Sequence, residues 1–338
     1  MTQYSTSESE KKIPVSVLIP AKNEELNMPK CLECVSRADE IFVVDSHSSD
    51  RTIEICKEQS EIYDIKIVQF DYERGSWPKK KNWALENLKF KHEWVLIVDC
   101  DEQITDELWR EIENIIENPQ YDGYYINRKV YFFDRWIKYG GKYPDWNLRL
   151  FKHAKGRYEN LLTEDGSDTG DNEVHEHVIL DKGSQEGFIE NAPMIHMDFK
   201  NISAWLARHN RYSNWEARFY DNLREGVYEK SVASHQGRII QPKWFQGTPL
   251  EKKRFIRKVW VWLPLRPLLR FIIVYFLKLG FLDGRAGYFY ARLISHYEAQ
   301  IGIKWYEMRN CQQNSQSVKV TKSDEKTNTT KLETNEAN

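Results

Sequence analysis

The segment Trp94–Glu102 constrains the fold of this chain more than any other part of the sequence. Five apolar residues at 94–98 are followed directly by Asp-Cys-Asp-Glu at 99–102. The apolar run predicts a short strand that is buried on both faces of a sheet. Carboxylates are costly to bury unless they are paired or bind a cation, and open α/β sheets bind ligands at the carboxyl ends of their strands. The Asp-x-Asp therefore indicates either a divalent cation that holds a phosphate or the first turn of a following helix, where acids are also favoured.

Strands and helices alternate along the first half of the chain. Short apolar runs predict strands at residues 14–20, 40–45, 65–70, 94–98 and 124–128, separated by helices that end near residues 36, 59, 88 and 117. This alternation predicts an α/β fold with a doubly wound, mostly parallel sheet flanked by helices. Two of the strands end in an acid, Asp45 and Asp99. Because both acids should lie at the same edge of the sheet, we expect a nucleotide site there.

The sequence lacks the motifs of the other common nucleotide and metal sites. No G-x-G-x-x-G follows the first strand, no G-x-x-x-x-G-K-[ST] occurs, and His175-Glu176-His177 lacks the spacing of a helical zinc site. The 49 basic and 51 acidic residues give a net charge of -2, which offers no overall basic surface for nucleic acid. Five cysteines, an odd number, and a polar N-terminus without a signal-peptide core predict a cytoplasmic protein.

The chain divides into four parts. We predict disorder at residues 1–12 and 312–338, an α/β catalytic domain at 13–200 and a helical region at 201–311. In the helical region two apolar runs, 259–265 and 271–277, are too short to span a bilayer and are separated by arginines. Such broken, aromatic and basic runs predict helices that lie in a membrane interface; the alternative is a helical subdomain that packs on the core or on a second subunit. The oligomeric state stays open.

Four stretches together resemble a known family. They read VSVLIPAKNEELNMPKCLECV, EIFVVDSHSSDRTIEI, KKKNWALENL and EWVLIVDCDEQITDELWREI, in this order. In this combination they are similar to the nucleotide-sugar domain of glycosyltransferase family 2, whose GT-A fold is a Rossmann-like sheet flanked by helices. DWNLRLFKHAKGRYEN, VHEHV and GFLDGRAGYFYA resemble the branch that contains the bacterial β-glucosyltransferases of the lipopolysaccharide core. The resemblance covers about residues 13–310.

The resemblance implies a donor site. By position in the family motifs, Asp101 is the main contact of a Mg²⁺ or Mn²⁺ ion, and Asp99 faces the ribose or the metal. Asp45 is expected to bind the nucleotide. The loop that follows the first strand, from Pro20 through Asn23 and Glu24, is expected to form the uridine or ribose pocket, although Glu24 also fits a solvated first helical turn. Asn82 matches a family position near the nucleotide.

A general base is needed because an acceptor hydroxyl attacks the anomeric carbon in an inverting transfer. Glu176 matches the base best by position, and Asp145 is the rival. A loop acid that is paired with a nearby arginine is the alternative for either residue. A carboxylate becomes a competent base once burial raises its pKa.

Three further side chains belong to the predicted site. His196 is either a third metal ligand, since imidazole is compatible with Mn²⁺, or a structural histidine in a strand. Trp146 could stack on a sugar, and Arg149 could reach the diphosphate or hold the base. A core tryptophan and a surface arginine are the alternatives.

The resemblance and the residues together favour an inverting, metal-dependent hexosyltransferase. It would move a hexose, glucose by the resemblance, from a UDP-sugar to a lipid-linked, lipopolysaccharide or exopolysaccharide acceptor at the cytoplasmic face of a membrane. Two alternatives are a sugar nucleotidyltransferase, which lacks support because no basic glycine-rich loop follows the first strand, and a non-catalytic membrane-bound scaffold.

Overall fold

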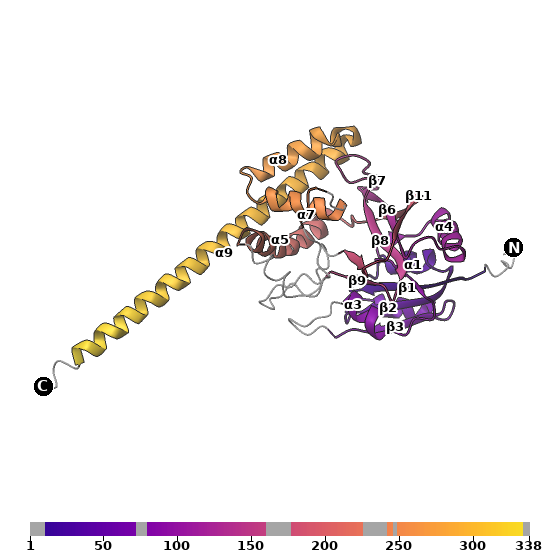
Figure 1. Ribbon diagram of the computed structural model, residues 1–338, viewed down its shortest axis with the longest axis horizontal. Coiled ribbons are helices and arrows are strands. Elements are labelled where there is room, and N and C mark those ends of the chain that lie inside the picture. The colour runs from indigo at the N-terminus through magenta and orange to yellow at the C-terminus, as the bar shows by residue number, and fades with distance from the viewer. Residues whose placement is uncertain (1–10, 72–79, 160–176, 226–241, 246–248, 334–338) are drawn as a thin grey trace.

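In the computed structural model, described over residues 11–71, 80–159, 177–225, 242–245 and 249–333, nine strands form one sheet (Figure 1). Their order is β3-β2-β1-β4-β8-β6-β11-β5, with β7 paired to β6. The strands are β1 Ile13–Ala21, β2 Ala38–Asp45, β3 Ile65–Gln69, β4 Trp94–Ile97, β5 Glu102–Gln103, β6 Gly123–Phe132, β7 Arg135–Trp136, β8 Trp146–Lys152 and β11 Glu186–His196. A separate antiparallel pair consists of β9 Gly156–Tyr158 and β10 Val178–Leu180.

The first four strands of the sheet are parallel, and the rest of the sheet is mixed. β1 pairs in parallel with both β2 and β4, and β2 pairs in parallel with β3. β8 runs antiparallel to β4 and β6, whereas β11 runs parallel to β6. The carboxyl ends of β1, β2 and β4 therefore meet at one edge, as the sequence predicts. The predicted α/β class with a C-terminal helical region is confirmed.

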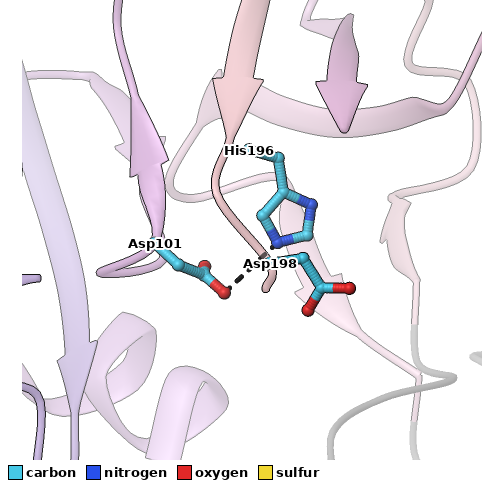
Figure 2. Close-up of side chains that lie close together, drawn as sticks. All are labelled: Asp101, His196 and Asp198. Atoms are coloured by element: carbon cyan, nitrogen blue, oxygen red, sulfur yellow. Dashed lines mark ion pairs between the residues drawn. The ribbon is translucent and has the colours of Figure 1, made fainter. Parts of the chain in front are cut away.

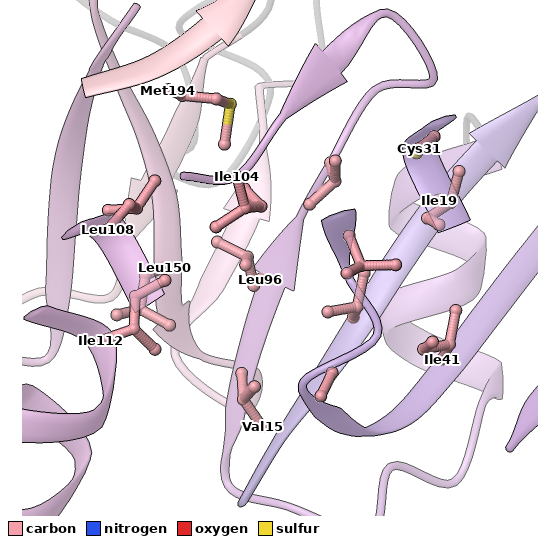
Figure 3. Close-up of a cluster of buried hydrophobic side chains, with 14 of the residues drawn as sticks. Val15, Ile19, Cys31, Ile41, Leu96, Ile104, Leu108, Ile112, Leu150 and Met194 are labelled. Atoms are coloured by element: carbon pink, nitrogen blue, oxygen red, sulfur yellow. The ribbon is translucent and has the colours of Figure 1, made fainter. Parts of the chain in front are cut away.

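Alternation along the strands sends apolar side chains to both faces of the sheet. On one face, Val15 and Ile19 of β1 and Leu96 of β4 pack against α1 Met28–Cys34, α2 Thr52–Gln59 and α4 Asp106–Glu117 (Figure 3). On the other face, Leu18 and Ile97 pack against α3 Lys80–Asn87 and the β9–β10 pair. Because both faces of the central strands are covered, β4 is buried along its length, as a continuous apolar run requires.

A helical region follows the sheet and packs beside it (Figure 1). It consists of α5 Ile202–Glu225, α7 Pro249–Trp260, α8 Arg266–Ile272, the π-helical turn η1 Ile273–Leu277, the 3₁₀ turn η2 Gly280–Asp283 and α9 Gly284–Glu333. Within the part of the chain that the structure describes, no helix is long and apolar enough to cross a membrane.

The far end of α9 differs from the prediction of a disordered tail. The helix continues to Glu333 and projects away from the rest of the molecule (Figure 1). A helix satisfies its backbone groups within the segment, so it can extend beyond its last packed turn without tertiary contacts. The predicted boundary at residue 312 is therefore corrected: residues 312–333 are helical. The predicted disorder at residues 1–10 and 334–338 falls outside the described residues.

Candidate functional site

A cavity of about 940 Å³ lies where the carboxyl ends of β1 and β4 face the helical region. This volume is within the range of pockets that hold cofactor-sized ligands. The sheet side contributes Pro20, Asn23, Glu24, Lys80, Lys81, Asp99, Asp101, Arg128, Asn147 and Arg149, and the helical region contributes Ala204, Trp205, Arg208, His209, Arg211, Tyr212 and Tyr297. The helical region therefore forms one wall of the cavity.

Strand pairing brings three possible metal ligands together. β5 pairs antiparallel with the end of β11, so that His196 lies opposite Glu102. The Met197 amide donates to the Asp101 carbonyl oxygen at 2.7 Å, which fixes the two segments side by side. His196 Nε2 lies 3.3 Å from an Asp101 carboxylate oxygen. One ligand atom each from Asp101, His196 and Asp198 lies within 4.8 Å of the others (Figure 2).

The chemistry of this triad fits a divalent cation. Carboxylate oxygens suit Mg²⁺ and Mn²⁺, and imidazole is an acceptable ligand for Mn²⁺. Burial opposes the charged form of His196, but the neighbouring Asp101 carboxylate outweighs it and raises the pKa of His196. Burial likewise opposes ionisation of Asp198, yet His196 and Arg208 keep its pKa lowered. His196 also lowers the pKa of Asp101 against burial, so both acids favour the ionised form, in which a carboxylate binds a cation.

Asp198 was missed by the sequence reasoning, although His196 was not. The signal was present as His-x-Asp at the end of a predicted strand. Residues two apart at a strand end can face the same side, so Asp198 follows His196 toward Asp101. A local pattern of this kind does not reveal that the strand lies next to the Asp-x-Asp loop, because that depends on the pairing of β11 with β5.

Along one wall of the cavity, six side chains form a continuous series of ion pairs. In order they are Lys81, Asp99, Arg149, Glu102, Arg128 and Asp145. Arg149 lies 2.5 Å from Asp99 and 2.6 Å from Glu102, which is fully buried. Three cations alternate with three anions, so the series is electrically neutral. Buried charges require this kind of pairing.

The series includes two residues of the predicted site, Asp99, expected at the ribose or the metal, and Asp145, the rival general base. Asp99 is held between Lys81 at 3.0 Å and Arg149, which together outweigh burial and keep its pKa well below the usual range. It is not part of the metal triad found among the described residues. Asp145 is disfavoured in its charged form by burial, but Arg128 at 2.6 Å lowers its pKa to about 2. A carboxylate with so low a pKa is a weak base, which corresponds to the paired-acid alternative.

The loop after β1 lines the cavity, and Asp45 is hydrogen-bonded to the segment that supports this loop. Pro20, Asn23 and Glu24 are lining residues. Asp45 is fully buried and accepts hydrogen bonds from the Ser48 amide at 2.9 Å and the Ser48 hydroxyl. The Asn23 amide in turn donates to Ser48 Oγ at 2.8 Å. Among the described residues, Asp45 is absent from the lining, and Ser48 links it to the loop after β1.

Two further predicted residues serve the framework. Asn82 is buried and forms hydrogen bonds with both backbone groups of Tyr158, at 2.8 and 3.0 Å, which ties α3 to β9. Trp146 packs edge-on against Phe188 with 5.1 Å between ring centroids. Neither is among the described residues that line the cavity, whereas Asn147, next to Trp146, is.

Arg149 and Lys81 both line the cavity. Glu176 lies outside the described residues. His177, which follows it directly in the sequence, lines the cavity.

Comparisons with known proteins identify the family. A family model described as glycosyl transferase family 2 matches residues 16–180. The lipopolysaccharide core biosynthesis glycosyltransferase LpsC of Rhizobium meliloti (strain 1021) is 30% identical over 213 residues, which are 61% of this chain and 71% of LpsC. A glycosyltransferase of Rickettsia bellii (strain RML369-C) is 26% identical over 225 residues, 64% of this chain and 70% of that protein. Among solved structures, S. aureus TarS 1-349 has a TM-score of 0.40 and 14% identity, over 83% of this chain and 90% of that one.

Proposed function

This chain belongs to glycosyltransferase family 2, and from that premise we propose that it is an inverting, metal-dependent hexosyltransferase. The donor is a nucleoside-diphosphate sugar, UDP-glucose in our proposal. The acceptor is a growing lipid-linked, lipopolysaccharide or exopolysaccharide glycan. The observation that carries the proposal is the triad of Asp101, His196 and Asp198 beside a cavity large enough for a nucleotide sugar. Similarity to a lipopolysaccharide core glycosyltransferase supports the acceptor class.

In the proposed reaction, an acceptor oxygen bonds to the anomeric carbon of the donor while the bond from that carbon to the diphosphate oxygen breaks. A Mg²⁺ or Mn²⁺ ion held by the triad would neutralise the charge that builds up on the diphosphate. The loop from Pro20 to Glu24 binds the nucleoside end of the donor. The neutral ion-pair series holds Asp99 and Arg149 in place, so the wall next to the diphosphate is preorganised before the donor arrives.

We propose Glu176 as the group that takes the proton from the acceptor hydroxyl. Two observations support this choice. Asp145, the rival, is committed to Arg128 and has a pKa of about 2. His177, the residue that follows Glu176 in the sequence, lines the cavity. A base with a pKa closer to neutrality accepts a proton more effectively during the transfer.

Donor binding and hydrolysis test the proposal. The purified protein is mixed with UDP-, GDP- and dTDP-sugars in the presence of Mn²⁺ or EDTA. We expect metal-dependent binding of one donor, with release of UDP and not of pyrophosphate, and loss of binding in Asp101→Ala. Asp64→Ala is the matched control, because Asp64 is an exposed acid that precedes β3 at the opposite edge of the sheet. If the folded protein binds no nucleotide sugar, the transferase proposal is refuted and the non-catalytic scaffold is favoured. Release of pyrophosphate instead of UDP would favour the sugar nucleotidyltransferase.

We propose that the helical region attaches the enzyme peripherally to the cytoplasmic face of a membrane. Residues 252–297 contain ten lysines and arginines but one acid, the buried Asp283. Large apolar side chains of α7, α8, η1, η2 and the segments that connect them are exposed: Val259, Trp262, Leu263, Leu265, Leu268, Ile272, Phe276, Leu277, Leu279, Phe281 and Leu282. Exposed apolar surface of this extent is unusual in a monomer and is typical of an interaction site.

The arginines within this surface point toward the protein. Arg266 lies 3.5 Å and Arg270 lies 3.1 Å from carboxylate oxygens of Glu298, which is buried on α9. The charges of α8 are thus neutralised inside, while Leu268 and Ile272 of the same helix face solvent. This arrangement supports a surface that dips into the lipid headgroup region, with the remaining lysines near anionic lipids.

Vesicle sedimentation tests the attachment. We expect binding to vesicles that contain phosphatidylglycerol and weak binding to pure phosphatidylcholine. Leu277, 72% exposed, should insert, and Leu277→Glu should reduce binding about tenfold or more, because burying a leucine contributes about 1.5–3 kcal/mol. Ile62→Glu, at a residue that is 69% exposed between α2 and β3, is the control and should bind as the wild type does. Equal binding of all three proteins would refute the attachment surface.

A further inference from the structure

The charges that line the cavity are unbalanced. Among the described residues, nine lysines and arginines but four carboxylates line it: Lys22, Lys80, Lys81, Arg128, Lys142, Arg149, Lys200, Arg208 and Arg211 against Glu24, Asp99, Asp101 and Asp198. Part of this excess is neutralised locally, since the ion-pair series is neutral, Lys200 lies 2.9 Å from Glu24 and Arg208 lies 2.5 Å from Asp198. A divalent cation and the diphosphate that it holds bring in little further net charge.

The remaining cations of the lining fall into two groups by position. Lys22 and Lys80 donate to backbone carbonyl oxygens of Ser46 and Ala21, at the end of the cavity formed by β1 and β2. Lys142 and Arg211 line the cavity at other elements, and neither side chain has a hydrogen bond or ion pair with the described residues. The first group is placed for the donor. The second group, Lys142 and Arg211, is available to bind a different anion.

Lys142 is kept charged in this position. The neighbouring Tyr290 hydroxyl raises the pKa of Lys142, and the carboxylates of Asp145 and Asp198 contribute in the same direction against burial. Asp145 and Asp198 are themselves paired with Arg128 and Arg208, so they do not neutralise the ammonium group. A cation in a cavity without its own carboxylate is an anion site by its chemistry.

The face of α5 that carries Arg211 also offers groups that suit a sugar. Trp205 and His209 stack with 3.4 Å between ring centroids. His209 Nδ1 lies 2.9 Å from the Trp205 carbonyl oxygen, which can only accept, so Nδ1 carries the proton. Burial lowers the pKa of His209 to about 4, so the ring is neutral near pH 7 and Nε2 is a hydrogen-bond acceptor. Tyr212, one turn from His209, also lines the cavity.

We propose that this wall is an acceptor subsite that selects a saccharide bearing an anionic group, a phosphate or a carboxylate. Arg211 and Lys142 bind the anion, and the Trp205–His209 pair and Tyr212 contact the sugar ring. The cavity-facing positions on α5 run from Ala204 to Tyr212, about 12 Å along the helix axis, and Arg208, between them, pairs with Asp198 of the triad. The inference rests on the proposed function and specifies the acceptor class for the same site.

Binding of matched sugars to the protein loaded with UDP and Mn²⁺ tests the subsite. The probes are mannose 6-phosphate and mannose, and galacturonic acid and galactose, titrated by saturation-transfer NMR. We expect at least one anionic member to bind about tenfold or more tightly than its neutral partner, as a charged hydrogen bond would produce. The pair that shows the difference identifies phosphate or carboxylate as the group selected.

Variants separate this subsite from the donor site. Arg211→Gln and Lys142→Gln should each reduce the preference for the anionic sugar at least fivefold and leave UDP affinity within twofold of the wild type. Arg211→Lys should retain part of the preference for the anionic sugar. Arg218→Gln, on α5 outside the cavity lining, should leave this preference unchanged. Equal binding of anionic and neutral sugars, or loss of UDP binding in Arg211→Gln, would overturn the subsite. Failure of the wild type to bind UDP would overturn the proposed function itself.

Discussion

Asp99 and Asp101 stand two residues apart in one motif, yet the structure predicts opposite consequences for their removal. Asp99→Asn takes one carboxylate from Lys81 at 3.0 Å and leaves Arg149 with Glu102 alone. Breaking a buried ion pair from one side destabilises a protein by about 3–5 kcal/mol. Because the Asp99 side chain is 30% exposed, we expect the lower end, about 3 kcal/mol. Metal affinity should change little, since Asp99 is outside the triad.

Asp101→Asn should do the reverse. Its carboxylate lies near His196 and is repelled by Asp198, so the loss of one interaction is offset by relief of the other and the free energy of unfolding should change by less than about 1 kcal/mol. Mn²⁺ affinity should fall by more than about 100-fold, because removing even a residue that only orients a metal ligand typically reduces affinity 10–100-fold.

Urea unfolding of the metal-free protein and calorimetric Mn²⁺ titration measure the two effects separately. The expected result is a crossed pattern, in which Asp99→Asn is unstable but binds metal and Asp101→Asn is stable but does not. If Asp99→Asn were as stable as the wild type and lost Mn²⁺ binding as Asp101→Asn does, both aspartates would be metal ligands and the ion-pair series would not carry the energy assigned to it.

Three further predictions follow from other contacts. Mn²⁺ affinity should fall as the pH is lowered, beginning above pH 6.5, because the raised pKa of His196 lets a proton compete with the cation; calorimetry in His196→Gln should show a weaker dependence. Glu298→Gln should lower the free energy of unfolding by about 3 kcal/mol, since it leaves Arg266 and Arg270 unpaired by carboxylate, whereas exposed Glu307→Gln should not. Gly287→Ala should lower the melting temperature, because a Cβ there would lie 2.0 Å from the Gly280 carbonyl oxygen; Gly302→Ala, whose Cβ would meet only the end of the Arg266 side chain at 3.3 Å, should not.

The parallel half of the sheet could be predicted because its information is local. A five-residue apolar run that ends in acids favours a short strand covered on both faces, and β4 is buried throughout. The carboxyl ends of parallel strands then meet without any knowledge of distant residues, which placed the loop from Pro20 to Glu24 and the Asp-x-Asp at one edge. The order of the four motifs indicated the family, which the pattern of strands and helices alone does not identify.

The partners of individual charges could not be predicted in the same way. The sequence shows that Asp99 and Asp145 are acidic and that Arg149 is basic. It does not show whether these side chains bind a ligand or form ion pairs within the protein. Their roles depend on the pairing of β4 with β8 and of β8 with β6, which no local pattern encodes. Asn82 is a further example, because its hydrogen bonds reach Tyr158, which lies 76 positions later.

In the enzyme that we propose, the placement of charge separates a fixed donor site from an acceptor site. On the sheet side, each cation of the ion-pair series has a carboxylate, so that wall is rigid and electrically neutral before any ligand binds. On the α5 side, Arg211 and Lys142 lack such partners among the described residues, so binding energy there is available only when an anion arrives. Neutral ion pairs hold the sheet-side wall in a fixed geometry, whereas the unneutralised cations on the α5 side select an anionic ligand. The two walls should therefore respond differently to ionic strength. Acceptor binding should weaken with ionic strength, while the stability of the ion-pair series, buried around Glu102, should change far less.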